Sequence, residues 1–309
     1  MQNILFIGGA GFIGSNLIKQ LTNNVSNYQI FVLEPQIANL DRLKDLNTTI
    51  INGNIKDILL IERIIVDYKI SIIVHLVSTL LPNSDYEEYK QEFENVIFPT
   101  YRIVKLCAKH SIKIIYFSSG GTIYGNRNNL TPFKENDKLE PISYYGLSKL
   151  IIEEYIIFEH RINNVEYLIL RPSNPYGNGQ NLYGKQGLIA VSIGKILSNI
   201  PIEIYGDGNQ IRDYIFIDDF AKIFHKLLDA NISNTILNIG SGKGYSVKQV
   251  IEFISQNLNR QLNVNIIPSR TTDVSNVILD TTKLQSLIPY DLTSLEIGIK
   301  SFIKSVIKN

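Results

Sequence analysis

Two side chains with the spacing of a proton-transfer pair stand near the middle of the chain. Tyr145 and Lys149 are four residues apart in a segment of helical periodicity that ends near His160, so both lie on one face of a helix. An ammonium group beside a phenol favours the phenolate and lowers the pKa of the tyrosine toward neutral pH. Such a tyrosine can take or give the proton of a hydroxyl group while a hydride moves. Because Tyr-x-x-x-Lys is also common on solvated surface helices, the surrounding elements must decide between the two interpretations.

A glycine-rich stretch near the N-terminus has the spacing of a phosphate-binding turn. The apolar run Asn3–Ile7 predicts a buried strand, GGAGFIG occupies residues 8–14, and helical spacing follows. Gly8 allows the tight turn, Gly11 lets a pyrophosphate approach the backbone, and Gly14 lets the helix pack close to the strand. The helix N-terminus offers free N–H groups and a partial positive charge to phosphates. The alternative is a simple turn between strand and helix.

An acidic residue follows the second predicted strand. Glu34 ends the run Gln29–Leu33, twenty positions after Gly14. A carboxylate there can accept both hydroxyls of an adenosine ribose and would repel a 2′-phosphate, which favours NAD over NADP. The alternatives are a solvent-facing glutamate and an effect of the nearby Arg42 on this preference.

Segments of strand and helix character alternate through the first half of the chain. Strands are predicted at residues 49–55, 71–78, 113–119 and 166–171, and helices at 58–68, 92–110 and 147–160. Pro99 is an awkward residue inside the second of these helices. The alternation implies an α/β fold with a parallel, doubly wound sheet. Ligands of such sheets bind beyond the carboxyl ends of the strands, where Glu34, Asn54, Ser78 and Ser119 fall.

A turn-rich segment, Pro172–Gln180, marks a boundary between two lobes. We expect a first domain over residues 1–172 and a second over 173–309, with segments near 211–240 returning to the first. The remainder mixes predicted helices with short strands. The helices are expected at 188–199, 218–230 and 247–258, and the strands at 202–204, 237–239 and 263–267.

Composition excludes several classes of protein. Of the 309 residues 44% are hydrophobic and 19% charged, and the net charge is +1, which is ordinary for a globular protein and gives no electrostatic case for nucleic acid or an acidic membrane. The single cysteine, Cys107, excludes an internal disulfide, and four scattered histidines argue against a metal site. The N-terminus reads as the first strand rather than a signal peptide, and no apolar run approaches the ~18 residues of a membrane span. We therefore expect a cytoplasmic protein without membrane or nucleic-acid partners.

The ordered motifs of the chain resemble the extended short-chain dehydrogenase/reductase family, in its NAD-dependent nucleotide-sugar epimerase/dehydratase group. They run from Gly8 to Lys283, nearly the whole chain. The motifs are GGAGFIG (8–14), HLVS (75–78), FSSGGTIYG (117–125), YYGLSK (144–149), RPSNPYG (171–177), GDGNQIRDYIFIDD (206–219), NIGSGKGYSV (238–247) and R-x-x-D (270–273). The resemblance implies a Rossmann-type doubly wound parallel sheet, with a smaller C-terminal α/β lobe that binds the substrate.

The resemblance also implies an NAD site. Its residues would be Gly8, Gly11, Phe12, Ile13, Gly14, Glu34, Asn54, Ile55, Leu76, Val77, Ser78, Tyr145, Lys149 and Pro172. The glycine turn would cradle the pyrophosphate, and Glu34 would hold the adenosine ribose. Asn54 and Ile55 would edge the adenine, where the family usually has an aspartate and then a hydrophobic residue. Leu76, Val77 and Ser78 would line the nicotinamide ribose.

The same resemblance implies catalytic and substrate-binding roles. Tyr145 would be the acid/base, and Lys149 would bind the ribose and tune Tyr145. A nucleotide sugar would be held by Asn174, Arg212, Arg270 and Asp273, with the arginines bridging its diphosphate. The alternative for the arginines is a surface ion pair, for Arg212 with the adjacent Asp213.

The chain departs from the family pattern at the second catalytic hydroxyl. Family epimerases usually carry serine or threonine three residues after the strand-five aromatic residue, and counting from Phe117 that position is Gly120. Ser119 and Thr122 flank it, and either hydroxyl, or a water molecule, could serve. The usual alanine pair after the fourth strand is Val77-Ser78, which could tune the shape of the substrate site.

The leading hypothesis is a UDP-hexose type nucleotide-sugar 4-epimerase with tightly held NAD. The alternative is an NAD(P)H-dependent reductase of a 4-keto-6-deoxy nucleotide sugar, such as a dTDP sugar. A 4,6-dehydratase is disfavoured because Gly121 and Thr122 stand where family dehydratases usually carry acidic residues. A non-catalytic dinucleotide sensor would not depend on Tyr145.

The resemblance further implies a homodimer that pairs through the helices at 92–110 and 147–160. The apolar faces contain Ile103 and Leu106 in the first segment and Leu150, Ile151 and Tyr155 in the second. The alternative is that these faces serve only the core of the chain itself.

Overall fold

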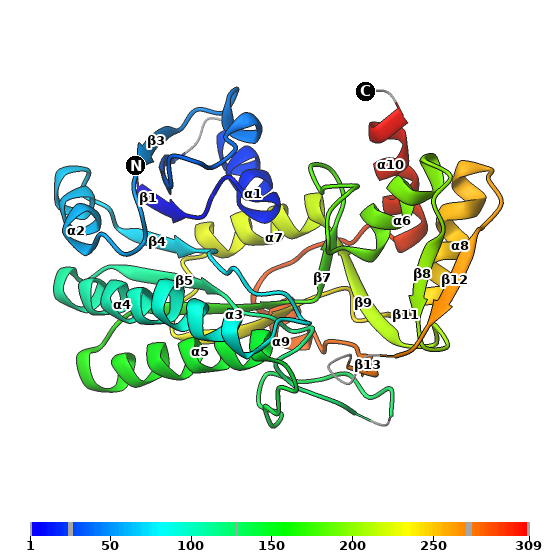
Figure 1. Ribbon diagram of the computed structural model, residues 1–309. Coiled ribbons are helices and arrows are strands. Elements are labelled where there is room, and N and C mark those ends of the chain that lie inside the picture. The colour runs from blue at the N-terminus through cyan, green and yellow to red at the C-terminus, as the bar shows by residue number, and fades with distance from the viewer. Residues whose placement is uncertain (1, 24–26, 128, 270–273, 308–309) are drawn as a thin grey trace. The chain divides into compact units, whose positions relative to one another are not determined.

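The computed structural model describes residues 2–23, 27–127, 129–269 and 274–307 (Figure 1). The chain divides into two compact units. The first comprises residues 1–119, 143–171 and 224–237, and the second comprises residues 120–142, 172–223 and 238–309. The cofactor and substrate roles expected of two domains remain predictions.

A seven-stranded sheet forms the centre of the first unit. Its strands are β1 (Gln2–Ile7), β2 (Tyr28–Glu34), β3 (Thr49–Asn52), β4 (Ile72–His75), β5 (Lys113–Phe117), β6 (Tyr167–Pro172) and β10 (Thr235–Ile239). They follow the order β10-β6-β5-β4-β1-β2-β3, and the neighbouring pairs from β6 to β3 are parallel. Residues Ile4 to Ile7 are at most 1% exposed, as expected for strands covered on both faces. The predicted doubly wound α/β fold is confirmed.

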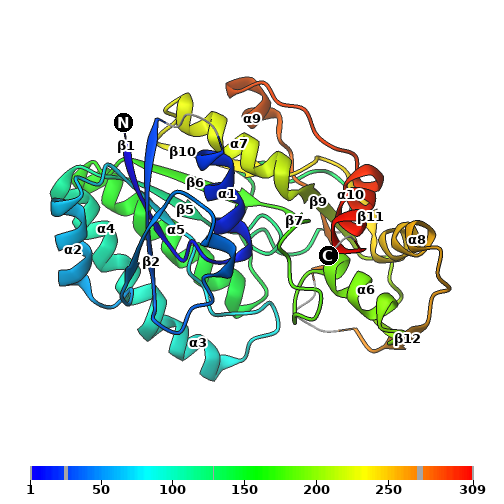
Figure 2. The ribbon, with the colours of Figure 1, turned by 90° about the horizontal axis from the view of Figure 1, so that it is seen from above.

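Helices cover both faces of this sheet. They are α1 (Phe12–Thr22), the 3₁₀ turn η1 (Asp41–Leu43), α2 (Ile58–Asp67), α3 (Tyr86–Glu92), the π-helical turn η2 (Phe93–Ile97), α4 (Phe98–His110), α5 (Tyr144–Asn163) and α7 (Ile217–Asp229). Figures 1 and 2 show α4 and α5 side by side on one face, with α1 on the other. Ile61, Ile103, Ile152 and Ile156 are at most 1% exposed in the core between the sheet and α2, α4 and α5. Each such side chain stabilises the fold by about 1.5–3 kcal/mol.

The strand order reverses between β1 and β4. From β1 the chain moves outward to β2 and β3, then crosses back so that β4 pairs with the other edge of β1. The loops after β1 and β4 therefore leave the sheet in opposite directions and lie beside each other. Such a switch point is where open α/β sheets bind ligands.

The helix predicted over residues 92–110 is divided into three parts around Pro99. The N–H of Phe98 donates to the carbonyl of Phe93, five residues back, which widens one turn into η2. Pro99 then occupies the first turn of α4, where its missing N–H costs no helical hydrogen bond. The wide turn explains how a long helical segment contains this proline.

The second unit has two smaller sheets. β7 (Asn174–Tyr176), β9 (Ile211–Phe216), β11 (Gly244–Ser246) and β13 (Asn276–Val277) form one, and β8 (Ile202–Tyr205) and β12 (Val264–Ile267) form the other. Its helices are α6 (Leu188–Leu197), α8 (Val247–Leu258), α9 (Thr282–Leu287) and α10 (Leu295–Ile307). A separate core joins α6, α8 and α10 to the four-stranded sheet of this unit. It contains Ile193, Phe216, Ile254 and Phe302.

Several of these elements were not among the predicted ones: β7, β9, β11, β13, α3, α9 and α10. Three of the four strands are only two or three residues long, too short for a periodic pattern. Within residues 2–23, 27–127, 129–269 and 274–307, none of the helices has the length and apolar character needed to cross a membrane.

Candidate functional site at the sheet switch point

The glycine turn after β1 has a different steric requirement at each of its three predicted glycines. Gly8 has φ +83°, and a Cβ there would lie 2.9 Å from Val77 Cγ2. A Cβ on Gly14 would lie 2.6 Å from the Gly9 carbonyl oxygen, whereas one on Gly11 would meet only the Gly8 carbonyl oxygen, at 3.7 Å. Gly8 and Gly14 are thus required by the fold, and Gly11 leaves the backbone open to a ligand.

The N-terminus of α1 is suited to an anion. Gly11 is its N-cap and supplies no side-chain hydrogen bond, and the first turn, which contains Phe12 and Ile13, has no acidic residue. The first N–H groups of a helix lack intrahelical partners and carry a partial positive charge. These N–H groups can therefore donate hydrogen bonds to a phosphate.

Glu34 lies at the carboxyl end of β2, beside the glycine turn. Its Oε1 accepts the N–H of Ala10 at 2.6 Å, and its carbonyl accepts the N–H of Gly53 at 2.9 Å. Burial raises the pKa of Glu34, and the Ala10 N–H offsets part of this effect. Ala10 is the sole donor to this carboxylate among the described residues, so the second oxygen is available to ribose hydroxyls.

The residues predicted to edge the adenine follow β3 directly. Asn54 is exposed, and its Oδ1 accepts the N–H of Lys56 at 2.9 Å, which forms a local turn. Ile55 packs against the core of the first unit. Both lie beyond the same sheet edge as Glu34, because Glu34 pairs with Asn52 at the ends of β2 and β3.

The segment after β4 lies against the glycine turn. The N–H of Leu76 donates to the carbonyl of Ile7 at 3.0 Å, and Val77 meets Gly8 as described above. The Ser78 hydroxyl donates to Glu92 Oε1 at 3.0 Å. Leu76, Val77 and Ser78 therefore border the switch point, and Ser78 is held by a buried carboxylate.

Tyr145 and Lys149 lie in the first two turns of α5, which is capped by Ser143. The Ser119 hydroxyl, just beyond β5, forms a hydrogen bond with the Tyr145 hydroxyl. Lys149 is 4% exposed, and its Nζ donates to the carbonyl of Phe117 at 3.0 Å. The Lys149 Nζ lies 5.6 Å from the centroid of the Tyr145 ring. Within the first unit, Ser119 is thus a hydroxyl that the fold brings to Tyr145.

The ionisation of this pair differs from the prediction. Burial and the nearby Glu92 carboxylate raise the pKa of Tyr145, and the hydrogen bond from Ser119 only partly offsets them. Burial lowers the pKa of Lys149 to about 8, against the opposing charges of Glu92 and Glu153. The expected lowering of the tyrosine pKa by Lys149 is therefore wrong for the protein alone, because burial and the Glu92 carboxylate disfavour the phenolate.

The residues of the first unit fit NAD. The Lys149 ammonium carries three hydrogens, and Phe117 supplies the sole protein acceptor for them among the described residues. A ribose could accept the others. With the open backbone at Gly11 and the available oxygen of Glu34, the sheet edge offers partners for a pyrophosphate and for two riboses.

The remaining predicted residues of the described chain lie in the second unit. Pro172 ends β6, and its carbonyl accepts the N–H of Gly120 at 2.8 Å. Asn174 Nδ2 donates to the carbonyl of Asp213 at 2.7 Å. Thr122 is half-buried in the segment 120–142.

Arg212 lies on β9, two positions before the residue that pairs with Asn174. Its Nη1 donates to the carbonyls of Ile211 and Ser275 at 3.0 and 3.1 Å, so the surface ion pair with Asp213 considered above is not what holds it. The Asp213 carboxylate instead accepts hydrogen bonds from Ser241, Gly242 and Leu279. Arg270 and Asp273 lie outside the described residues.

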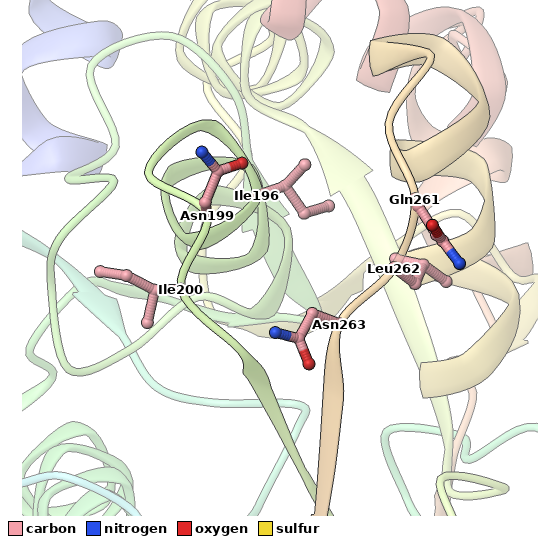
Figure 3. Close-up of a pocket in the computed structure, with 6 residues that line it drawn as sticks. All are labelled: Ile196, Asn199, Ile200, Gln261, Leu262 and Asn263. Atoms are coloured by element: carbon pink, nitrogen blue, oxygen red, sulfur yellow. The ribbon is translucent and has the colours of Figure 1, made fainter.

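A surface hollow of about 390 Å³ in the second unit holds none of the predicted residues (Figure 3). It lies at the end of α6 and the start of β12, and is lined by Ile196, Asn199, Ile200, Gln261, Leu262 and Asn263. These side chains are apolar or amide groups, which provide no acid, base or nucleophile.

The residue that sequence analysis missed is Glu92, which is fully buried beside the predicted catalytic pair. It was placed only at the start of a predicted helix. The segment Gln91–Asn95 is uniformly polar apart from Phe93, so nothing in its local pattern indicates that this one glutamate is buried.

Comparisons with known proteins agree with this arrangement. The profile of the NAD dependent epimerase/dehydratase family matches residues 4–240. The chain is 34% identical over 302 residues to a Methanocaldococcus jannaschii protein named "Putative UDP-glucose 4-epimerase", with 97% of both chains covered. It is 33% identical over 313 residues to a dTDP-4-dehydro-6-deoxyglucose reductase of Escherichia coli, with 99% of this chain and 98% of the relative covered.

A crystal structure of UDP-glucose 4-epimerase from Thermotoga maritima, with UDP-glucose, is similar over 99% of both chains. The TM-score is 0.91 and the sequence identity is 30%. The family profile, the two relatives and the geometry of the glycine turn together lead to one conclusion. The chain is an enzyme of the NAD dependent epimerase/dehydratase family, and its cofactor is NAD.

Proposed function

We propose that the protein is an NAD-dependent nucleotide-sugar 4-epimerase of the UDP-hexose type. The observation that carries the proposal is the hydrogen bond between Ser119 and Tyr145, with the Lys149 ammonium beside them at the carboxyl end of β5. Two adjoining hydroxyl groups can both contact one secondary alcohol of a sugar. The similarity over nearly full length to UDP-glucose 4-epimerases supports this substrate class.

The first unit would hold the cofactor. The pyrophosphate would lie at Gly8, Gly11, Phe12, Ile13 and Gly14, where α1 begins. The adenosine would lie at Glu34, Asn54 and Ile55, and the nicotinamide ribose at Leu76, Val77, Ser78 and Lys149. Pro172, the last residue of β6, is the remaining residue of the proposed NAD site. When bound, NAD accepts a hydride from carbon 4 of the sugar and gives it back.

In its phenolate form, Tyr145 would take the proton of the sugar O4 hydroxyl as the C4–H bond breaks, and return it when the ketone is reduced again. Ser119 would donate a hydrogen bond to the same oxygen and so limit its position. An epimerase differs from a one-way oxidoreductase in the next step. The keto sugar must rotate in the site, so that the hydride returns to its opposite face.

The second unit would hold the nucleotide sugar. Asn174 and Arg212 lie on the paired strands β7 and β9, and Arg270 and Asp273 complete the proposed set. Arginine suits a diphosphate because its planar fork donates two parallel hydrogen bonds.

A second candidate is a 4-keto-6-deoxy nucleotide-sugar reductase that uses NAD(P)H. It is favoured by the Escherichia coli reductase, which is 33% identical to the chain, and by glycine at position 120, where family epimerases usually have a hydroxyl. This reaction needs Tyr145 only as the acid that protonates the product oxygen.

The nucleotide that stays bound to the purified protein distinguishes the two candidate functions. The protein is isolated without added cofactor, denatured, and the released nucleotide is quantified by chromatography; the native protein is then assayed with UDP-glucose. Retained NAD together with UDP-galactose formed without added coenzyme supports the epimerase. An empty protein that turns over a dTDP-4-keto sugar only with NADH or NADPH contradicts it.

We also infer a homodimer built on α4 and α5. Ile103 and Leu106, predicted for the α4 face, are buried within the chain itself. The two helices instead expose Phe98, Phe158 and Ile162 by 55%, 45% and 54%, which are large apolar groups for a free surface. Phe158→Glu should convert a dimer to a monomer in light scattering at micromolar concentration. Leu59→Glu, at a 75% exposed position on α2, is the control that should remain dimeric. A parent protein that is monomeric contradicts the inference.

A further inference from the structure

Tyr116 is a buried tyrosine beside the proposed catalytic pair that the reaction does not yet use. It lies on β5, one residue before Phe117, and is 0% exposed. Its hydroxyl has no hydrogen-bond partner within the described part of the chain. Because an unpaired buried hydroxyl costs free energy, the hydroxyl does not explain why a tyrosine occupies this position. Any contribution of Tyr116 to the site therefore comes from its aromatic ring.

The ring of Tyr116 packs against the ring of His75. The two residues pair across β5 and β4, and their ring centroids lie 5.7 Å apart with 57° between the planes. The Nε2 of His75 shares a hydrogen bond of 2.9 Å with the Thr100 hydroxyl on α4. Burial lowers the pKa of His75 to about 3, so this neighbour is neutral and places no second cation beside the Tyr116 ring.

The Tyr116 ring also lies beside the Lys149 ammonium. The Lys149 Nζ is 5.3 Å from the centroid of the Tyr116 ring and 5.6 Å from that of Tyr145. The negative face of an aromatic ring attracts a cation within about 6 Å of its centroid, and the attraction is stronger when the pair is removed from water. Lys149 is 4% exposed, so this interaction is largely desolvated.

A ring face suits this position because it attracts the ammonium without taking a hydrogen from it. The Lys149 Nζ donates to the carbonyl of Phe117 at 3.0 Å, and its other hydrogens can still be donated to a ribose. Burying an ammonium is costly unless the surroundings compensate for its charge. Tyr116 and Phe117 are consecutive residues of β5, so one strand supplies both the ring and the carbonyl that hold Lys149.

We propose that Tyr116 is a positioning residue of the active site, whose ring face holds the Lys149 ammonium at the carboxyl end of β5 through a cation–π interaction. The inference rests on the proposed role of Lys149 in binding the nicotinamide ribose. It predicts that the electron density of the Tyr116 ring, and not only its volume, determines how well Lys149 is charged and how tightly NAD binds.

A series of phenylalanine analogues at position 116 separates the electron density of the ring from its shape. Tyr116→Phe keeps the ring and loses only the unpaired hydroxyl. Replacement of Tyr116 by difluoro- or trifluorophenylalanine withdraws electrons from the ring face and leaves its size nearly unchanged, and Tyr116→Leu removes the ring. Tyr167→Leu is the matched control, because Tyr167 is a buried tyrosine of the same sheet whose ring contacts His160, with 5.1 Å between the centroids.

The first readout is the pKa of Lys149 in the protein without cofactor. Lysine labelled with ¹³C at Cε is followed by NMR, and the Lys149 signal is assigned by its loss in Lys149→Met. Tyr116→Phe should match the parent, the pKa should fall with each added fluorine, and Tyr116→Leu should lower it by about one unit. The carboxylates of Glu92 and Glu153 also favour the ammonium, but they are the same in every variant.

A Lys149 pKa that does not change along the fluorinated series, or that falls equally in Tyr167→Leu, overturns the inference. The fluorinated proteins decide this point even where Tyr116→Leu does not fold. A ring that served only to fill space would give the same pKa throughout the series, since fluorination does not reduce the volume of the side chain.

The second readout is NAD affinity, measured by calorimetry. Tyr116→Phe should bind NAD within about twofold of the parent, and the trifluorophenylalanine protein about threefold to tenfold more weakly. Equal affinity in these two proteins overturns the positioning role. Failure of the proposed function would be distinct: Lys149→Met would bind NAD as tightly as the parent, or Tyr145→Phe would retain full turnover, while the Lys149 titration in the empty protein would still test Tyr116.

Discussion

Arg171 and Glu153 form an ion pair that is almost wholly removed from water, with 2.6 Å between Nη2 and Oε2 and side-chain exposures of 2% and 0%. The pair joins β6 to α5, the helix that carries Tyr145 and Lys149. Arg171 also begins the RPSNPYG motif, so the first residue of this motif has a structural role here.

Replacing one partner of this ion pair should lower the free energy of unfolding far more than replacing both partners together. Arg171→Met and Glu153→Leu should each lower the free energy of unfolding by about 3–5 kcal/mol, because either leaves a buried charge unpaired. The double variant should lie closer to the parent than either single variant does. Urea denaturation followed by circular dichroism measures these differences. Lys138→Met, in an exposed ion pair with Glu140, should cost less than about 1 kcal/mol. Additive losses in the double variant would contradict the prediction.

Removing the Ser119 hydroxyl should slow turnover without emptying the cofactor site. Ser119→Ala should reduce kcat by about 10²-fold or more, as when one positioned donor is lost from a reacting oxygen, with NAD affinity unchanged. Thr122→Ala is the comparison, since Thr122 was the other hydroxyl considered from the sequence, and its kcat should remain near that of the parent. Steady-state kinetics on both variants decides the matter, and a larger loss in Thr122→Ala would reverse the assignment.

Acid should destabilise the fold through His75. The Thr100 hydroxyl donates to the carbonyl of Val96 at 2.6 Å and so accepts the Nε2–H of His75 at 2.9 Å. The Nδ1 of His75 has no partner among the described residues, so a second proton would have no acceptor. The pKa of His75 is about 3 in the folded protein against an ordinary 6.5, and the unfolded chain therefore takes up this proton first.

The contribution of His75 to stability is complete above pH 6.5 and is lost as the pH falls toward 3, by up to about 1.4 kcal/mol per pH unit. His75→Gln, which retains an N–H for Thr100, should remove this slope from the free energy of unfolding between pH 6 and pH 4. His110→Gln, near the surface and beside Glu62, should retain it. Parallel curves for the parent and His75→Gln would disprove the assignment.

Glu34 should determine the choice between NAD and NADP. Glu34→Ser should weaken NAD binding by about tenfold, because two charge-assisted hydrogen bonds to ribose hydroxyls are lost, and it should improve the relative binding of NADP. Because burial raises the pKa of Glu34, NAD affinity should decline on acidification at a higher pH than an ordinary glutamate would dictate. Calorimetric titration with both dinucleotides tests this, with Glu62→Ser as a surface control. An unchanged NAD to NADP ratio would refute it.

Local spacing by itself determined much of the first unit. The order strand, glycine turn and helix over residues 3–22 follows from an apolar run, three glycines and helical periodicity, because each is a short-range property of the backbone. The same holds for the common helix face of Tyr145 and Lys149 and for Glu34 at a strand end. Regular alternation of strands and helices was enough to predict the parallel sheet.

The tertiary structure determined the contacts, the burial and the pKa values of these residues. Ser119 meets Tyr145 because β5 and α5 pack in the same unit. Glu92 is buried and hydrogen-bonded to Ser78 and Thr79 of the segment after β4, although its sequence neighbours are mostly polar. The pKa of Tyr145 rises instead of falling because desolvation and the carboxylate of Glu92, which is remote only in sequence, both act on it. Burial and the distance between charges depend on segments far apart in the chain, and spacing within one helix cannot encode them.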